Sequence, residues 1–278
     1  MVIGKDRVGT SVGRRAQTAR RVELRVKPVA LRRPLLEISG LRKTFGRRIV
    51  FDDLSFSASV GELVIVTGDS GAGKTTLLKL IHGQLRPDRG QIWVDGHPLH
   101  RRWLRGIDRV RRDAGFIFQD HRLLPRLNAL ENVITALQMA RPEVPYGVIR
   151  RAAHTSLEAV GLAEDKAKFP AQLSLGERQR VAVARTLALQ PRIVLADEPT
   201  ASLDERNAGV VIDLLKQAAG AGALVVVATH HLDFGSSQVV SLPKVPVPPQ
   251  APRRLPSRVA ARVPGRLAGR AASRRKKK

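Results

Sequence analysis

The chain has 278 residues, 43% of them hydrophobic, and a formal net charge of +25. This length suits one large domain or two small ones, with enough apolar residues for a sizeable core. The absence of cysteine excludes disulfides and thiolate metal sites. The longest apolar stretches fall far short of a membrane span, and the N-terminus lacks an apolar signal segment, so we expect a soluble protein that stays inside the cell.

The positive charge is concentrated at the two ends of the sequence. Residues 1–34 carry a net charge of +8 and residues 234–278 a net charge of +12, which leaves +5 for the part between them. Because both ends lack sustained apolar periodicity, we expect 1–34 and 244–278 to be disordered and 35–243 to form the folded domain. Basic tails attract anionic lipid head groups or nucleic acid. The alternatives are a solvated tail without a function and an atypical end of the reading frame.

Three short segments before residue 100 have the pattern of antiparallel strands. Residues 35–38 and 51–57 alternate between apolar and polar side chains, as half-buried strands do. Residues 91–94 form a third segment, and Asp95 and Gly96 after them are typical of a turn. The sequence therefore predicts an antiparallel β subdomain at the start of the folded domain.

The most informative motif lies between an apolar segment, residues 63–67, and a run compatible with a helix. It matches the phosphate-binding pattern G-x-x-x-x-G-K-[ST], whose glycines let several backbone N–H groups point at one phosphate chain. Lys74 is expected to reach the β- and γ-phosphates, and the Thr75 hydroxyl to bind Mg²⁺. The residues expected to contact the nucleotide here are Gly68, Asp69, Ser70, Gly71, Ala72, Gly73, Lys74, Thr75 and Thr76.

Helices and strands alternate through the rest of the domain. Most of residues 121–170 have helical spacing, interrupted at Pro142 and Pro145. The alternation predicts a parallel α/β core with an inserted helical lobe. Helices are expected over 101–112, 129–139, 148–160, 181–189 and 210–219, and strands over 63–67, 115–118, 192–197, 224–228 and 238–242.

Two acidic residues follow one of the apolar strands. Asp197 closes the run 193–196, at the edge where parallel sheets bind ligands. One carboxylate held there suits Mg²⁺, which takes oxygen ligands and keeps waters. Glu198 is then placed to polarise a water for in-line attack on the γ-phosphate.

Two further polar residues follow other strands of the predicted core. Gln119 comes after the strand 115–118 and is expected to touch Mg²⁺ or the attacking water. His230 comes after the strand 224–228 and can hydrogen-bond the γ-phosphate. The adjacent His231 leaves the assignment between the two histidines open.

Together with the segment 173–180, Leu-Ser-Leu-Gly-Glu-Arg-Gln-Arg, these motifs resemble those of the ABC-transporter ATPases. That segment resembles the signature sequence of the family, and residues 202–204 resemble its D-loop. Gln119 matches the Q-loop residue, His230 the switch histidine and Phe45 the aromatic residue that stacks on adenine. Over residues 35–243 the resemblance implies an α/β, ABC-type P-loop NTPase. This fold has a RecA-like mixed-sheet core, an antiparallel β subdomain and an inserted helical subdomain at about residues 120–180.

The resemblance also implies a mechanism. Two copies of the chain would close head to tail around two ATP molecules, so that Ser174, Gly176 and Glu177 of one copy contact the γ-phosphate bound to the other. Glu198 would drive hydrolysis, and Gln119 would couple closure to an integral membrane partner. The implied cofactors are ATP and Mg²⁺, and the implied location is peripheral, on the cytoplasmic side of the cell membrane.

Within the family, residues 118–124, 160–162, 166–173 and 196–200 resemble the cell-division ATPases, whose membrane partner is of the FtsX type. ATPases of lipoprotein-releasing and macrolide-export transporters are the main alternative. A nucleic-acid-binding ATPase that uses the basic tails is an alternative of another class, although such ABC proteins normally carry two cassettes. Leu175 stands where the signature usually has glycine, which leaves a scaffold that binds ATP without hydrolysing it as a third alternative.

Overall fold

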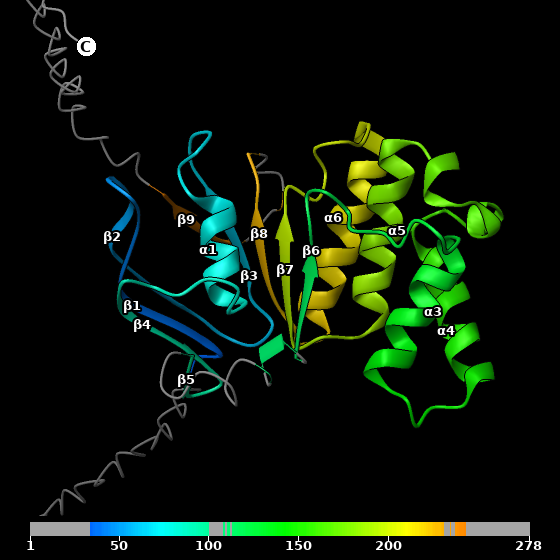
Figure 1. Ribbon diagram of the computed structural model, residues 1–278, viewed down its shortest axis with the longest axis horizontal. Coiled ribbons are helices and arrows are strands. Elements are labelled where there is room, and N and C mark those ends of the chain that lie inside the picture. The colour runs from blue at the N-terminus through cyan, green and yellow to red at the C-terminus, as the bar shows by residue number, and fades with distance from the viewer. Residues whose placement is uncertain are drawn as a thin grey trace, which may run out of the picture. The chain divides into compact units, whose positions relative to one another are not determined.

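The computed structural model describes residues 34–99, 108, 110, 111, 113–230, 234 and 237–242. Within these residues the chain forms two β-sheets and a set of helices (Figure 1). The expected extensions other than Pro34, most of the expected helix over 101–112, and His231 lie outside the described residues. No helix in the described part of the chain is long and apolar enough to cross a membrane.

The first sheet is antiparallel and has the strand order β2-β1-β4-β5. Its strands are β1 (Leu36–Phe45), β2 (Arg48–Ala58), β4 (Arg89–Val94) and β5 (His97–Pro98). The expected antiparallel strands are therefore present. Strands β1 and β2 are longer than expected because their pairing continues to a two-residue turn, where Phe45 pairs with Arg48.

The second sheet is parallel in every described pair and has the order β6-β7-β8-β3-β9. Its strands are β3 (Leu63–Thr67), β6 (Ala114–Ile117), β7 (Ile193–Asp197), β8 (Leu224–Ala228) and β9 (Gln238–Ser241). Strands β7 and β8 are buried along their whole length, as expected for a parallel sheet covered on both faces. The carboxyl ends of all five strands therefore meet at one edge.

The helices are α1 (Lys74–Ile81), α3 (Ala129–Ala140), α4 (Tyr146–Ala159), α5 (Leu175–Ala188) and α6 (Glu205–Gly220), with short 3-10 turns η1 (Glu164–Ala167) and η2 (Pro170–Gln172). Helices α5 and α6 begin earlier than the apolar periodicity predicts. Ser174 caps α5 by accepting a hydrogen bond from Glu177 N at 3.2 Å, and Asp204 caps α6 through Asn207 N at 2.9 Å. These caps fix first turns that carry few apolar residues.

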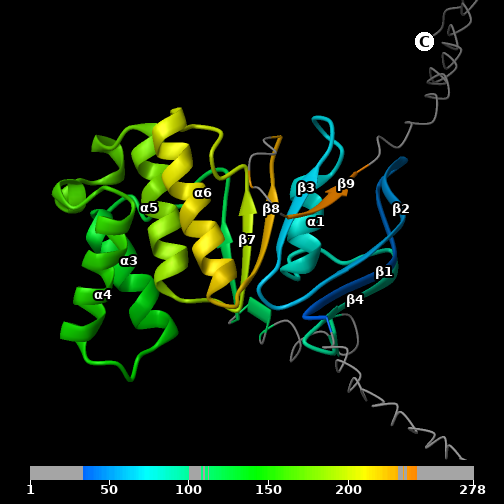
Figure 2. The ribbon, with the colours of Figure 1, turned by 180° about the vertical axis from the view of Figure 1, so that it is seen from behind.

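Two buried cores lie on the two faces of the parallel sheet. On one face, Val64 and Val66 of β3 pack with α1 and the antiparallel sheet. On the other, Leu63 and Ile65 pack with α5, α6 and the helices of the inserted lobe. One strand serves both cores because its side chains alternate between faces. Figure 2 shows the helical side from behind, with α3 and α4 beyond α5 and α6. The α/β fold class is thereby confirmed.

Candidate active site

The phosphate loop connects β3 to α1 at the carboxyl edge of the parallel sheet. Gly73, the residue before the helix, has φ of 105°. A Cβ atom there would lie 2.3 Å from Val50 Cγ1, so only glycine fits both the backbone angle and the space. The loop thus brings the start of α1 close to β2, and the helix N-terminus offers N–H groups to an anion.

Lys74 lies at the centre of a cluster of polar groups. Its Nζ atom donates to Gly68 O at 3.0 Å and lies 2.7 Å from His230 Nε2. The same Nζ is 3.7 Å from Glu198 Oε1. The Lys74 side chain is only 7% exposed. Its ammonium group therefore interacts mainly with these three groups, which come from the segments after β3, β7 and β8. The cluster is where the sequence places the phosphates.

Asp197 and Thr75 contact each other across the loop. Thr75 Oγ1 donates to Asp197 Oδ1 at 3.0 Å. Asp197 is 3% exposed, and its burial raises the pKa of the carboxyl group. The hydrogen bond from Thr75 opposes this rise, while the neighbouring Glu198 adds to it. A buried carboxylate that lacks a full counter-charge is suited to a divalent cation.

Glu198 occupies a strained backbone conformation directly after β7. Its φ is 47°, in the left-handed region, and its N–H donates to Ala228 O at 2.8 Å. Its Oε1 lies 3.5 Å from His230 Nε2. Strain of this kind persists where the surroundings fix the residue, and it is frequent at active sites.

A pocket of about 460 Å³ opens over these groups. The structure brings eleven of the sequence-predicted residues to its wall, whereas Gly68, Asp69 and Ala72 do not line it. Phe45, 48% exposed, supplies an aromatic face at the rim. The predicted residues that line the pocket are Phe45, Ser70, Gly71, Gly73, Lys74, Thr75, Thr76, Gln119, Asp197, Glu198 and His230.

Arg48 and Val50 also line this pocket, and sequence reasoning missed both. The Arg48 guanidinium donates to Gly71 O, so a second cation stands over the phosphate loop. The turn that pairs Phe45 with Arg48 places the ring and the cation side by side. Nothing in the spacing of the β1–β2 hairpin indicated that its tip would reach the loop.

Gln119 reaches the pocket from the end of β6. It also lines a smaller adjoining hollow with Thr75 and Asp197. The residues after it are fixed by α5, since the Arg185 guanidinium donates to His121 O at 2.8 Å and to Arg122 O at 2.7 Å. Gln119 therefore lies between the expected metal ligands and the inserted helical lobe.

The signature residues Ser174, Gly176 and Glu177 do not line the pocket in the described chain. They form the start of α5, where Glu177 Oε2 accepts from Ser174 N at 2.7 Å. Helix α5 leads into the amino end of β7, so its own N-terminus lies toward the carboxyl edge that carries the phosphate loop. Leu175 is 50% exposed there.

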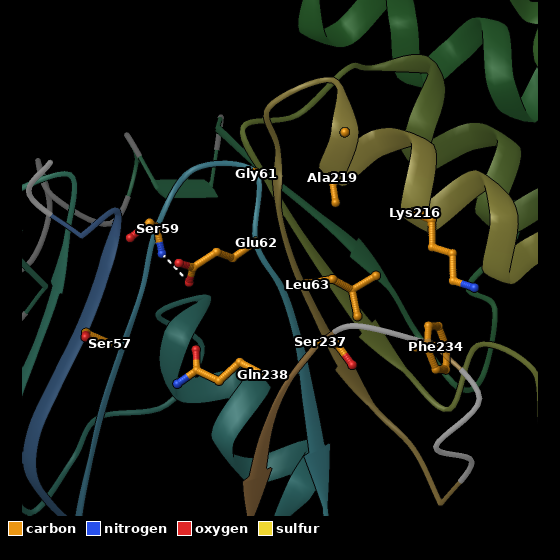
Figure 3. A pocket seen from close by; sticks show the side chains of 11 residues that line it. Ser57, Ser59, Gly61, Glu62, Leu63, Lys216, Ala219, Phe234, Ser237 and Gln238 are labelled. Atoms are coloured by element: carbon orange, nitrogen blue, oxygen red, sulfur yellow. Dashed lines mark hydrogen bonds between the residues drawn. The ribbon is translucent and has the colours of Figure 1, made fainter.

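A larger hollow, about 1070 Å³, lies at the opposite edge of the parallel sheet (Figure 3). Leu63 and Gln238, which begin β3 and β9, line it with residues near the end of α6. Glu62 in its wall accepts a hydrogen bond from Ser59 N at 2.8 Å. None of the expected nucleotide-binding residues in the described part of the chain lines it. Because parallel sheets bind ligands at their carboxyl edge, the smaller pocket is the functional candidate.

Comparison with known families decides the identity of this arrangement. The family model described as ABC transporter matches residues 51–201. The chain belongs to the ABC transporter ATPase family. It is accordingly an ATP-binding and ATP-hydrolysing subunit.

Relatives within the family have several roles. The chain is 40% identical over 189 residues to the cell division ATP-binding protein FtsE of Escherichia coli (strain K12), covering 68% of this chain and 84% of that protein. It is 34% identical over 219 residues to the octopine permease ATP-binding protein P of Rhizobium meliloti, covering 73% of this chain and 80% of that protein. The resemblance to cell-division ATPases is confirmed, and relatives from import systems are also similar.

Solved structures of ATP-binding cassettes share the fold. A dimeric cassette in a post-hydrolysis state, bound to ADP and Pi, superposes with a TM-score of 0.68 at 32% identity. The match covers 74% of this chain and 94% of that chain. A dimeric bacterial ABC transporter cassette gives a TM-score of 0.69 with the same identity and coverage.

Proposed function

We propose that this chain is the ATPase subunit of a membrane complex in cell division or cell-wall remodelling, acting with an integral membrane protein of the FtsX type. Two copies would close around two ATP molecules. The observation that carries the composite site is the separation of Ser174 and Gly176 from the pocket that contains Lys74. The cell-division assignment rests on the 40% identity to FtsE over most of that protein.

In this proposal Lys74 exchanges its partners when ATP binds. Its ammonium group, held by Gly68 O, His230 and Glu198, would turn toward the β- and γ-phosphates. The N–H groups at the start of α1 and the Arg48 guanidinium would neutralise further phosphate charge. The ring of Phe45 at the rim would stack on adenine, which needs only the ring face.

The residues beside Lys74 fit a Mg²⁺ ion. Thr75 Oγ1 and Asp197 Oδ1 are already within 3.0 Å of each other, and Gln119 adjoins both. Mg²⁺ is usually held by one or two carboxylates together with substrate phosphates, so this small donor set is sufficient. Held by Thr75, Asp197 and Gln119, such an ion would supply positive charge against the charge of the phosphate oxygens. In the described residues no group of three or more His, Asp or Glu competes for a metal.

Glu198 and His230 would carry the hydrolytic step. The Glu198 carboxylate would accept a proton from the attacking water. The water oxygen would form a bond to the γ-phosphorus while the bond between the γ-phosphorus and the β-phosphate oxygen breaks. His230 would hydrogen-bond the γ-phosphate and position that water. Their separation of 3.5 Å allows both to reach one water molecule.

The basic ends of the sequence would add attraction to anionic lipids at the cytoplasmic face of the membrane.

The signature residues would act on the ATP of the second copy. Ser174 and the N-terminus of α5 present a hydroxyl and backbone N–H groups, a combination that binds phosphate oxygens. Glu177, which closes the capping box, would hold this end of the helix in place.

The test is co-expression with a tagged FtsX-type membrane protein. We expect the chain to co-purify with it from membranes and its ATP turnover to rise in the complex. The matched variant is Glu198→Gln, which should still co-purify but show no turnover. Capture by an octopine-type permease and not by an FtsX-type protein would overturn the cell-division assignment while leaving the ATPase assignment intact.

A further inference from the structure

Residues 202–204, which precede α6, lie against the start of α5. A Cβ atom at Gly176 would be 3.2 Å from both Leu203 Cδ2 and Ser202 O, so the helix backbone approaches this segment closely. Any larger residue at position 176 would push the two segments apart. The signature end of α5 and the segment 202–204 therefore already touch within one copy of the chain.

A chain of side-chain hydrogen bonds fixes this contact one turn further along α5. The Arg180 guanidinium donates to Asn207 Oδ1, and Asn207 Nδ2 donates to Asp204 Oδ2 at 2.6 Å. The hydrogen bonds from the Asn207 backbone and side chain, followed by the charge of Arg180, lower the pKa of Asp204. Asn207 is thus a two-way link: its oxygen faces α5 and its nitrogen faces the end of the segment 202–204.

Two overlapping backbone turns lead from Glu198 to the segment. Ala201 N donates to Glu198 O at 3.3 Å, and Leu203 N donates to Thr200 O at 3.1 Å. These two turns connect the candidate catalytic carboxylate to the segment that Asn207 holds. Glu198 belongs to the copy's own ATP site, whereas Ser174 and Gly176 are proposed to serve the ATP of the other copy.

We infer that Arg180 and Asn207 are positioning residues that lock the segment 202–204 and the start of α5 into one rigid unit, against which a second copy of this chain docks. The inference rests on the proposed head-to-tail dimer. It assigns Asn207 the role of coupling the copy's own Glu198 to the signature surface that it offers to its partner. Neither residue lines the nucleotide pocket, so both act through other residues.

Asn207→Ala tests this role with little disturbance of the fold. The cap of α6 uses the backbone N–H of residue 207, which alanine retains. In a Glu198→Gln background, we expect ATP-dependent dimerisation, measured by analytical ultracentrifugation, to weaken about tenfold, the usual effect of losing a hydrogen bond to a charged group. Nucleotide affinity of the dilute monomer should not change. Arg206→Ala, at the exposed neighbouring position, is the control and should leave both unchanged.

A double-mutant cycle tests whether Arg180 and Asn207 act together or independently of each other. Arg180→Ala and Asn207→Ala combined should weaken dimerisation no more than the stronger single variant, because either one breaks the same chain of hydrogen bonds. Additive losses of dimerisation free energy would contradict the joint role of the two residues. Unchanged dimerisation of Asn207→Ala, or an equal loss of nucleotide affinity by the monomer, would overturn it.

Amide hydrogen exchange of the monomer tests the inference even if no dimer forms. Failure of Glu198→Gln alone to dimerise with ATP would contradict the proposed function and not the lock. In that case Asn207→Ala should still accelerate amide exchange both in residues 202–207 and in residues 174–180. Acceleration confined to 202–207 would show a local role and overturn the inference.

Discussion

The Nζ atom of Lys74 lies 2.7 Å from Nε2 of His230, although 156 positions separate the two residues in the sequence. The first follows β3 and the second follows β8, two neighbouring strands of the parallel sheet. The lysine of the phosphate loop and the histidine that follows β8 therefore lie within hydrogen-bond distance of each other. In the proposed function, an entering γ-phosphate would replace this contact with one contact from each residue to the nucleotide.

His230→Ala should separate binding from hydrolysis. The variant leaves Lys74 with Gly68 O and Glu198, so we expect ATP affinity to stay within a few-fold of wild type. Turnover should fall by about a hundredfold, a common effect of losing a group that positions or transfers a proton. Equilibrium binding of ATP and steady-state phosphate release measure the two effects. A parallel loss of both would assign His230 to binding alone.

Asp197→Asn should stabilise the nucleotide-free protein. Burial raises the pKa of this carboxyl group, so above its ordinary pKa the ionised form opposes folding, and the penalty is relieved as pH falls. Asparagine removes the charge and keeps an oxygen that can accept from Thr75. We expect the free energy of unfolding at pH 7 to rise by about 0.5–2 kcal/mol, with loss of Mg²⁺-dependent turnover. Chemical denaturation checks the first effect, and lower stability would contradict it.

His82 should make the protein sensitive to acid. Its ring packs edge-on against Phe116, with centroids 5.3 Å apart, and burial followed by the Arg111 charge lowers the pKa of His82 from 6.5 to about 4. Between pH 6.5 and pH 4, His82 therefore binds a proton in the unfolded chain but not in the folded chain. The free energy of unfolding falls as pH decreases through this range.

His82→Phe keeps the ring contact and removes this titration. Between pH 7 and pH 5 the wild-type protein should lose about 1–2 kcal/mol more unfolding free energy than the variant. Urea unfolding at the two pH values measures the difference. Equal losses in the two proteins would show that His82 is not the group responsible.

Leu175→Gly should strengthen closure of the dimer. The leucine side chain is half exposed at the first position of α5, beside the signature residues that are proposed to face the second ATP. Glycine would allow closer backbone approach there, at a cost of about 0.5–1 kcal/mol in helix stability. We expect a lower ATP concentration for half-maximal turnover and a slightly lower melting temperature. A fall in turnover would instead show that Leu175 makes a productive contact.

Much of the fold could be predicted because local patterns agree with the final structure. Residues 63–67 form β3 with the expected bounds, and the phosphate loop follows at once because its glycines permit the turn that sequence spacing requires. Asp197, Gln119 and His230 converge because parallel strands end at one edge.

Other features depend on contacts that no local pattern encodes. The starts of α5 and α6 are set by the caps Ser174 and Asp204, since their first turns carry few apolar residues. Arg48 reaches the phosphate loop only because β1 and β2 pair as far as a tight turn. The link from Arg180 to Asn207 joins helices that are separated by a buried strand, so sequence periodicity gives no indication of it.

Mixing two inactive variants tests the composite site most directly. Lys74→Ala should destroy the phosphate loop of its own copy, and Leu175→Asp should place a negative charge beside the signature residues while remaining compatible with a helix N-terminus. Each variant alone should be nearly inactive. In an equal mixture we predict that turnover recovers to about a quarter of the wild-type rate, because half of the random dimers are mixed and each mixed dimer has one intact site. A mixture no more active than the two variants measured apart would contradict a site shared between two copies.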